Sequence, residues 1–256
     1  MSDWQLLHTE TTDGVGYLFL DNGQRFNTLH SECIHELRAA LAVLEADSTV
    51  GCIVLTGAPG ESFAVGANIA EMKDFSSLDS WKFSQLGNGL FDQIETSKKP
   101  IIGALNGITM GGGCDLALAC DIRIGSDRLK IAHPGAKLGI ITGFCGTQKL
   151  PRLVGINKAK EIFMTSRTYS AEEALQMKLV EQVYPADQFM PLVRKYAEQI
   201  AHQPPMALHL AKKLLNASEN VCVTNGQVME LGAFASLFPR AGKMERIEEF
   251  FAAHSH

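Results

Sequence analysis

The sequence predicts an α/β fold with mostly parallel strands, followed by a helical C-terminal region. In the first half of the chain, short apolar runs alternate with stretches of helical periodicity, and Gly or Pro residues bound the runs. Past residue 145 strand-like runs nearly vanish and helical patterns dominate. Strands that alternate with helices favour parallel pairing, because two parallel strands need a long crossover connection, which is usually a helix.

The strands are predicted from compact apolar runs that end or begin at turn residues. VGYLFL at 15–20 stops at Asp21-Asn22-Gly23, and CIVLT at 52–56 stops at Gly57-Ala58-Pro59-Gly60. Pro100 precedes a third run. The later strands are expected at IIGAL 101–105, IRIGS 122–126 and LKIAH 129–133.

The helices are predicted from apolar residues that recur at helical spacing. The first opens at Ser31 and carries Ile34, Leu37, Leu41 and Leu44 on one face. Two more are expected over 79–95 and through LALAC at 116–120. The C-terminal helices are expected at 157–165, 171–178, 187–202, 205–217 and 243–253. Ser170 and Glu173 form a capping box at the start of the second of these.

The change of pattern along the chain predicts two regions, a sheet-bearing core over 1–190 and a helical oligomerisation region over 191–256. The stretch from Gln203 onward is helical and rich in apolar residues. So much apolar surface is hard to bury on one small core, and exposed patches of that kind mark interfaces. Closed symmetry is the usual solution, so we expect a homo-oligomer.

The composition is that of a soluble globular protein: 256 residues, 46% hydrophobic and 20% charged, with a net charge of -5. Without a basic stripe or an apolar run of about 18 residues, neither nucleic acid nor a membrane is an expected partner. The six cysteines lack CxxC pairs and metal-ligand spacing, and the N-terminus lacks the pattern of a signal peptide. We therefore expect a reduced, cytoplasmic protein without a metal site.

Several catalytic motifs are absent. The sequence contains no GxGxxG, GxxxxGK[ST], GxSxG or HExxH. These absences leave backbone amides, rather than a nucleophile or a metal, as the expected chemical apparatus.

Two glycine-rich segments supply such amides, GESFAVGANIAEM at 60–72 and NGITMGGGCDLALACDI at 106–122. Each follows a predicted strand and leads into a helix, so free N–H groups can point outward near a helix N-terminus. Two such turns side by side could aim two amides at one oxygen, which is the geometry of an oxyanion hole. The alternative is that these glycines only permit tight packing of strand against helix.

The sequence resembles the crotonase superfamily, also called the enoyl-CoA hydratase/isomerase family. The resemblance covers the chain from about residue 14 to the C-terminal helix. It is carried by Phe26-Asn27-Thr28-Leu29, residues 62–69, residues 106–122, Leu138-Gly139-Ile140, residues 146–155 and residues 171–180.

The resemblance implies a crotonase-like spiral of ββα turns with a helical C-terminal trimerisation region, assembled as a trimer or a dimer of trimers. It implies that the amides of Ala67 and Gly112 form the oxyanion hole for an acyl-CoA thioester. The CoA groove would be lined by Arg25, Phe26, Ala67, Asn68, Ile69, Ala70 and Gly112. No cofactor is implied, since coenzyme A is part of the substrate.

The chain differs from the family at the positions of the catalytic carboxylates. A typical hydratase of this family carries two glutamates that position and activate water. The first corresponds to Asp115, which is shorter by one methylene, and the second to Gly135. The aspartate of some isomerases corresponds to Gly143. Asp115 is thus either a catalytic carboxylate or a charge stabilised in the first turn of a helix. His133, beside the vacant position, is expected either to be a packing or loop residue or to titrate near neutrality.

The leading hypothesis is an enoyl-CoA hydratase or isomerase that stabilises a thioester enolate. Asp115 would be the only carboxylate that acts directly on the substrate. Such one-base chemistry predicts weak hydration of crotonyl-CoA. The alternatives are acyl-CoA decarboxylation or thioester hydrolysis on the same scaffold, and an acyl-CoA-binding protein of low turnover. Since a fold hosts many functions, the resemblance does not choose among them.

Overall fold

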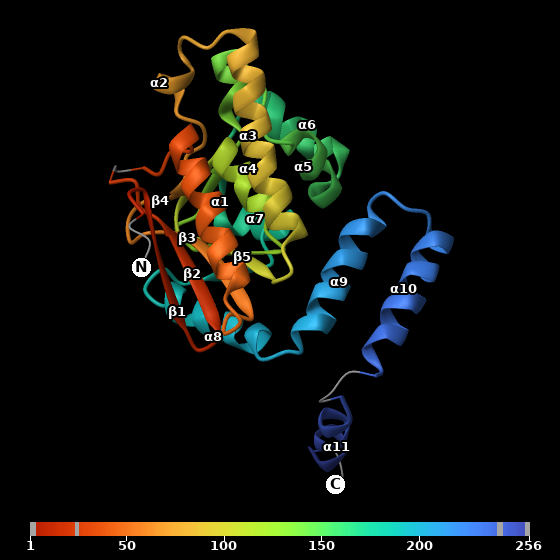
Figure 1. The fold of residues 1–256 in the computed structure, drawn as a ribbon. Helices are drawn as coiled ribbons and strands as arrows, with labels where there is room; N and C mark the ends of the chain where they lie inside the picture. Colours follow the sequence, from red (N-terminus) through yellow and green to blue (C-terminus); the bar gives the residue numbers. More distant parts are fainter. Residues whose placement is uncertain (1–3, 24–25, 240–242, 254–256) are drawn as a thin grey trace. The chain divides into compact units, whose positions relative to one another are not determined.

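The computed structural model describes residues 4–23, 26–239 and 243–253. It divides into two compact units, Met1–His202 and Gln203–His256. The first unit contains both β-sheets, and the second is helical (Figure 1). Within the described residues, no helix is long and apolar enough to cross a membrane.

Two sheets form the first unit. The larger has six strands in the order β1 (Leu7–Thr12), β2 (Val15–Leu20), β3 (Cys52–Gly57), β5 (Ile101–Leu105), β7 (Ile122–Ser126) and β10 (Gln182–Tyr184). The smaller has the order β4 (Ser62–Ala64), β6 (Ile108–Met110), β8 (Lys130–Ala132) and β9 (Tyr169–Ser170). All pairs are parallel except β1 with β2 and β8 with β9.

Successive strands alternate between the two sheets. β3 is followed by β4, β5 by β6 and β7 by β8, so each turn of the chain adds one strand to each sheet. Helices follow the first two of these pairs: α2 (Ile69–Met72) and α3 (Ser77–Thr96), then α4 (Gly112–Ala119). This arrangement confirms the predicted α/β class and the spiral of ββα turns.

Both faces of the larger sheet are covered. On β2, Tyr17 and Phe19 pack with Phe189 and Val193 of α8 (Phe189–Ala201), whereas Leu18 lies in the core beneath α1 (Ser31–Ala46) and α3. Figure 1 shows α1 and α3 side by side over this sheet. A strand buried on both faces has no polar side to expose, which explains the uninterrupted apolar run at 15–20.

Most predicted strands and helices are confirmed to within two residues at each end; α4 begins earlier than predicted, at Gly112. The prediction missed β1, which is mostly polar and exposed, and the short strands β4, β6, β9 and β10. The remaining elements of the first unit are η1 (Pro134–Leu138), α5 (Gly146–Val154), α6 (Ile156–Thr165) and α7 (Ala171–Gln176). The capping box of Ser170 and Glu173 is present at α7.

The second unit consists of α9 (Pro205–Ser218), α10 (Val223–Leu237) and α11 (Lys243–Ala253), and α9 packs against α10. The predicted boundary at residue 190 falls inside α8, which packs on the sheet of the first unit. Helix α10 was not predicted. It carries exposed apolar side chains, among them Val228, Leu231 and Phe234.

A buried asparagine joins the segment before α1 to the smaller sheet. The side-chain amide of Asn27 donates to the carbonyls of Ser62 (3.3 Å) and Phe63 (3.1 Å), and its backbone N–H donates to the Ser62 hydroxyl (3.1 Å). Asn27 is 7% exposed, so these carbonyls have little access to water. The same strand, β4, leads directly into the first glycine-rich turn.

We expect Asn27→Ala to lower the free energy of unfolding by about 1–3 kcal/mol, because it leaves buried carbonyls without donors. Urea denaturation followed by circular dichroism measures this change. Asn220→Ala, at an exposed position, is the matched control and is expected to change stability by less than about 0.5 kcal/mol. Equal effects of the two substitutions would contradict a structural role for the Asn27 junction.

Candidate active site

The first glycine-rich turn lies beside the segment that precedes α1. The N–H of Val65 donates to the carbonyl of Asn27 (2.7 Å), and the N–H of Leu29 donates to the carbonyl of Gly66 (2.8 Å). Gly66 has φ +94°, a conformation that favours glycine. The N–H of Ala67 takes part in neither bond, and Ala67 is partly exposed.

The second turn joins β6 to α4. Gly111, with φ +52°, donates its N–H to the carbonyl of Ala132 (2.9 Å) and precedes the first helical residue, Gly112. The first N–H groups of a helix have no acceptor within the helix. The amide of Gly112 is therefore available to a ligand, and it lies at the positive end of the helix dipole.

The two turns touch. A Cβ added to Gly66 would lie 2.9 Å from the Gly112 nitrogen, and a Cβ added to Gly112 would lie 3.4 Å from the Ala67 nitrogen. Because a Cβ is two bonds from its own nitrogen, the amide nitrogens of Ala67 and Gly112 are at most about 6 Å apart. That spacing allows both N–H groups to bind one oxygen at hydrogen-bonding distance.

The other predicted groove residues are placed as follows. Asn68 accepts hydrogen bonds from the N–H groups of Ala70 (3.0 Å) and Glu71 (3.4 Å), so its side chain caps α2. Ile69 and Ala70 are exposed at the start of that helix, and Phe26 is half-buried. Arg25 lies outside the described residues. The structure thus brings Ala67 to Gly112, and residues 68–70 follow Ala67 at the start of α2.

Asp115 is buried one turn into α4 and has two side-chain partners. His133 Nε2 lies 2.8 Å from Asp115 Oδ1, and the Thr142 hydroxyl donates to Oδ2. His133 is itself buried, with its ring 4.5 Å from that of Phe163. Each carboxylate oxygen has a second lone pair that can accept a further hydrogen bond, although the Asp115 side chain has no exposed surface.

Burial and pairing shift both members of this pair toward holding a proton. Burial raises the pKa of the Asp115 carboxyl, although the hydrogen bonds from His133 and Thr142 oppose the rise. Burial, the largest single influence, lowers the pKa of His133, but the hydrogen bonds and charges of Asp115 and Cys114 together more than offset it, and the pKa rises to about 10. The expectation that His133 titrates near neutrality is therefore wrong. At neutral pH the pair therefore retains a proton that can be shared between imidazole and carboxylate.

A side chain at either vacant acid position would meet a close neighbour, backbone at Gly135 and a side chain at Gly143. A Cβ at Gly135 would lie 2.9 Å from the Ile140 carbonyl oxygen, and one at Gly143 would lie 3.3 Å from the Ser84 hydroxyl. A glutamate at residue 135 would thus require the backbone to shift. The sequence analysis did not identify Thr142 or Phe144 as site residues. The stretch Thr142-Gly143-Phe144-Cys145-Gly146 places a bulky aromatic residue between two glycines, and this pattern could have indicated Phe144.

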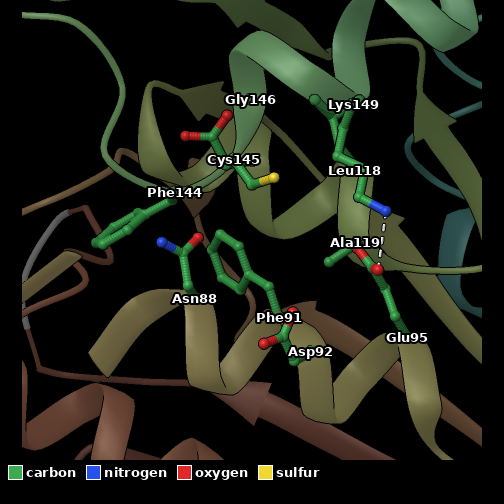
Figure 2. A pocket seen from close by; sticks show the side chains of 11 residues that line it. Asn88, Phe91, Asp92, Glu95, Leu118, Ala119, Phe144, Cys145, Gly146 and Lys149 are labelled. Carbon is green, nitrogen blue, oxygen red and sulfur yellow. Dashed lines mark hydrogen bonds and ion pairs between the residues drawn. The ribbon is translucent and has the colours of Figure 1, made fainter. Parts of the chain in front are cut away.

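Two cavities lie near this pair. Asp115, Phe144, Cys145 and residues of α3 enclose about 20 Å³, room for about one water molecule. Figure 2 shows Phe144 and Cys145 beside Asn88 and Phe91, with the ion pair of Lys149 and Glu95 at one end. A larger cavity of about 380 Å³ has His133, Thr142, Phe163 and Met164 in its wall.

Comparison with known proteins identifies the family. The sequence model of the enoyl-CoA hydratase/isomerase family matches residues 10–251. The chain belongs to the enoyl-CoA hydratase/isomerase family. It is 35% identical to the short-chain-enoyl-CoA hydratase of Clostridium acetobutylicum over 236 residues, 92% of this chain and 90% of the relative.

Further relatives support this assignment. The crotonyl-CoA hydratase of Syntrophomonas wolfei is 33% identical, over 94% of this chain and 93% of the relative. The crystal structure of an enoyl-CoA hydratase from Bacillus anthracis matches with a TM-score of 0.93 at 30% identity and covers 97% of each chain. Family and fold together support an enoyl-CoA hydratase or isomerase activity.

The stability of this family member is expected to fall as pH rises from about 6.5 to about 10. The pKa of His133 is raised from 6.5 to about 10, so between these values the folded protein binds more protons than the unfolded chain. The contribution is fully present below pH 6.5 and is lost as pH rises toward 10, with a slope of at most about 1.4 kcal/mol per pH unit.

Urea unfolding at several pH values, for wild type and His133→Gln, measures this slope. The variant should show a flatter dependence, whereas His35→Gln, at an exposed position on α1, should behave as wild type. Parallel curves for wild type and His133→Gln would show that the pair does not hold the additional proton.

Proposed function

We propose that the protein binds an enoyl-CoA thioester, with the thioester oxygen between the amides of Ala67 and Gly112, and moves protons with Asp115. The observation that carries this proposal is the contact between the two glycine-rich turns, which brings the two amides within about 6 Å of each other. The reaction needs no cofactor, because coenzyme A is part of the substrate.

The two amides would stabilise the enolate that forms when charge moves onto the thioester oxygen. They are held by the backbone before the substrate arrives, so no reorganisation is needed as the charge develops. The dipole of α4 adds to the stabilisation, because Gly112 is its first residue. Loss of one such donor typically slows a reaction by about 10²–10³.

Asp115 is proposed as the acid–base group that touches the substrate, and His133 and Thr142 as the residues that position it. In isomerisation, a single base takes a proton from Cα of a 3-enoyl thioester and returns it to Cγ. In hydration, a proton passes from water to Cα while the hydroxyl adds to Cβ. One carboxylate suffices for the first reaction, whereas family hydratases use two. We therefore expect isomerisation to be faster than hydration.

The exchange of Cα protons of a saturated acyl-CoA in D₂O, followed by NMR, tests enolate formation without requiring water addition. We expect wild type to catalyse exchange and Asp115→Asn to lower its rate by about 10²–10⁴. Asp92→Asn is the matched control, since Asp92 lines the small cavity without a bond to His133. Unchanged exchange in Asp115→Asn would place the catalytic base elsewhere. The same preparations, given crotonyl-CoA and a 3-enoyl-CoA, compare hydration with isomerisation.

We further propose that the chain assembles as a trimer or a dimer of trimers through its second unit. Large apolar side chains of that unit are exposed, including Leu215 (69%), Leu231 (68%) and Phe234 (62%). Exposed apolar side chains that form a large patch mark an interface, and we propose that these do so. Three copies related by a closed rotation would each bury the same patch.

Light scattering should give three or six times the 27.8 kDa of one chain. The double variant Leu231→Glu, Phe234→Glu places charge in the apolar patch and should shift the mass toward that of the single chain. Val43→Glu replaces an exposed apolar residue of α1 and should leave the assembly intact. A wild-type mass of one chain at micromolar concentration would contradict the proposal.

A further inference from the structure

The ring of Phe144 fills the space between α3 and the start of α4. A Cβ added to Gly87 of α3 would lie 2.2 Å from one ring carbon of Phe144, and a Cβ added to Gly112 would lie 3.0 Å from two carbons at the other edge. The ring is therefore accommodated by a glycine on each side. Phe144 is 4% exposed and packs 5.3 Å from the ring of Phe83 and 5.4 Å from that of Phe91.

The backbone around Phe144 is held to both neighbouring elements. Its N–H donates to the Thr142 hydroxyl (3.1 Å), and that hydroxyl donates to Asp115. The carbonyl of Gly143 accepts from the side-chain amide of Asn88 (3.1 Å) and from the Ser84 hydroxyl. The close-up in Figure 2 shows Phe144 near Asn88 and Phe91 of α3. These contacts oppose rotation of the ring out of its site.

The ring also lies next to the two amides proposed to bind the thioester oxygen. The Cβ position of Gly112 that is 3.0 Å from the ring is only 3.4 Å from the Ala67 nitrogen. A thioester carbon bonded to the bound oxygen would sit within a few ångströms of the ring edge. The cavity that remains around Phe144 has a volume of about 20 Å³, far less than an acyl chain requires.

We propose that Phe144 determines acyl-chain specificity by closing the inner end of the acyl pocket, which restricts the substrate to short acyl groups. The inference rests on the proposed binding of a CoA thioester at Ala67 and Gly112. An acyl chain that extended from the oxyanion hole toward α3 would meet the ring. A short chain ends before it.

The larger cavity at His133 is the competing place for an acyl chain. Its volume of about 380 Å³ is ample, and Met164 and Phe163 lie in its wall. Neither Ala67 nor Gly112 is among the residues that line this cavity or the small one, but the ring of Phe144 lies 3.0 Å from a Cβ position on Gly112. A chain that starts at the two amides is therefore expected to meet Phe144 rather than Met164.

The test compares kcat/KM for crotonyl-, hexenoyl- and decenoyl-CoA in wild type, Phe144→Ala, Phe144→Leu and Met164→Ala. Wild type should prefer crotonyl-CoA. Phe144→Ala should raise the ratio of kcat/KM for decenoyl-CoA to that for crotonyl-CoA by about tenfold or more, since each methylene accepted by an apolar pocket is worth about that factor. Met164→Ala, the matched control, should leave the ratio unchanged.

Phe144→Leu and a binding measurement keep the test decisive if Phe144→Ala does not fold. Calorimetric titration with butanoyl- and decanoyl-CoA needs no turnover, and the Leu variant should gain affinity for the longer ester. If wild type neither turns over these substrates nor exchanges the Cα protons of a saturated acyl-CoA, the proposed function fails, while the titrations still decide the role of Phe144. Equal use or binding of short and long esters by wild type would overturn the inference. A change of preference in Met164→Ala but not in the Phe144 variants would also overturn it.

Discussion

The close approach of two backbone turns is the constraint on which the rest of this structure depends. A Cβ at Gly113 would lie 2.0 Å from the carbonyl oxygen of Ala64, a distance at which no side chain fits. Only glycine allows the start of α4 to reach the end of β4. This contact joins one turn of the spiral to the next, and it places the amides of Ala67 and Gly112 at a common edge. The same feature therefore serves packing and creates the candidate oxyanion hole, so the two interpretations of the glycine-rich segments are not exclusive.

The same approach buries the first turns of α4 and with them a carboxylate. An unpaired buried charge is strongly unfavourable, and Asp115 is stabilised by partners from two other segments, His133 and Thr142. The site thus contains a hydrogen-bonded Asp–His pair where family hydratases carry two glutamates. A pair of this kind holds one proton under conditions in which two nearby carboxylates would repel each other. The chemistry proposed for the site is therefore proton transfer by one carboxylate, which a neighbouring imidazole positions.

Similarity to the family specifies the fold, whereas a few residues that differ from the family pattern change the site. Relatives named as hydratases share 33–35% of their residues with this chain over most of their length, and that similarity is enough to specify the spiral and the paired turns. Residues 135 and 143–145 lie in the segment between β8 and α5, which packs over Asp115 and α3. Changes there alter the acid–base groups and the volume of the pocket while the scaffold is retained. Phe144 illustrates this, because its ring occupies space that Gly87 and Gly112 leave open.

The sequence by itself determined the α/β class, most helices, the long buried strands and the two glycine-rich turns, because these depend on local periodicity, capping and the conformational freedom of glycine. It also indicated Ala67, Gly112 and Asp115 through resemblance, while their catalytic roles stay predictions. Strands of two or three residues, such as β4 and β6, were missed since their stability comes from partners distant in sequence. Only the tertiary structure decided that His133 pairs with Asp115, that Thr142 completes the pair, and that Phe144 reaches Gly112. Side chains from separate segments meet there because the spiral stacks its turns. A local sequence pattern does not predict which residues of successive turns come into contact.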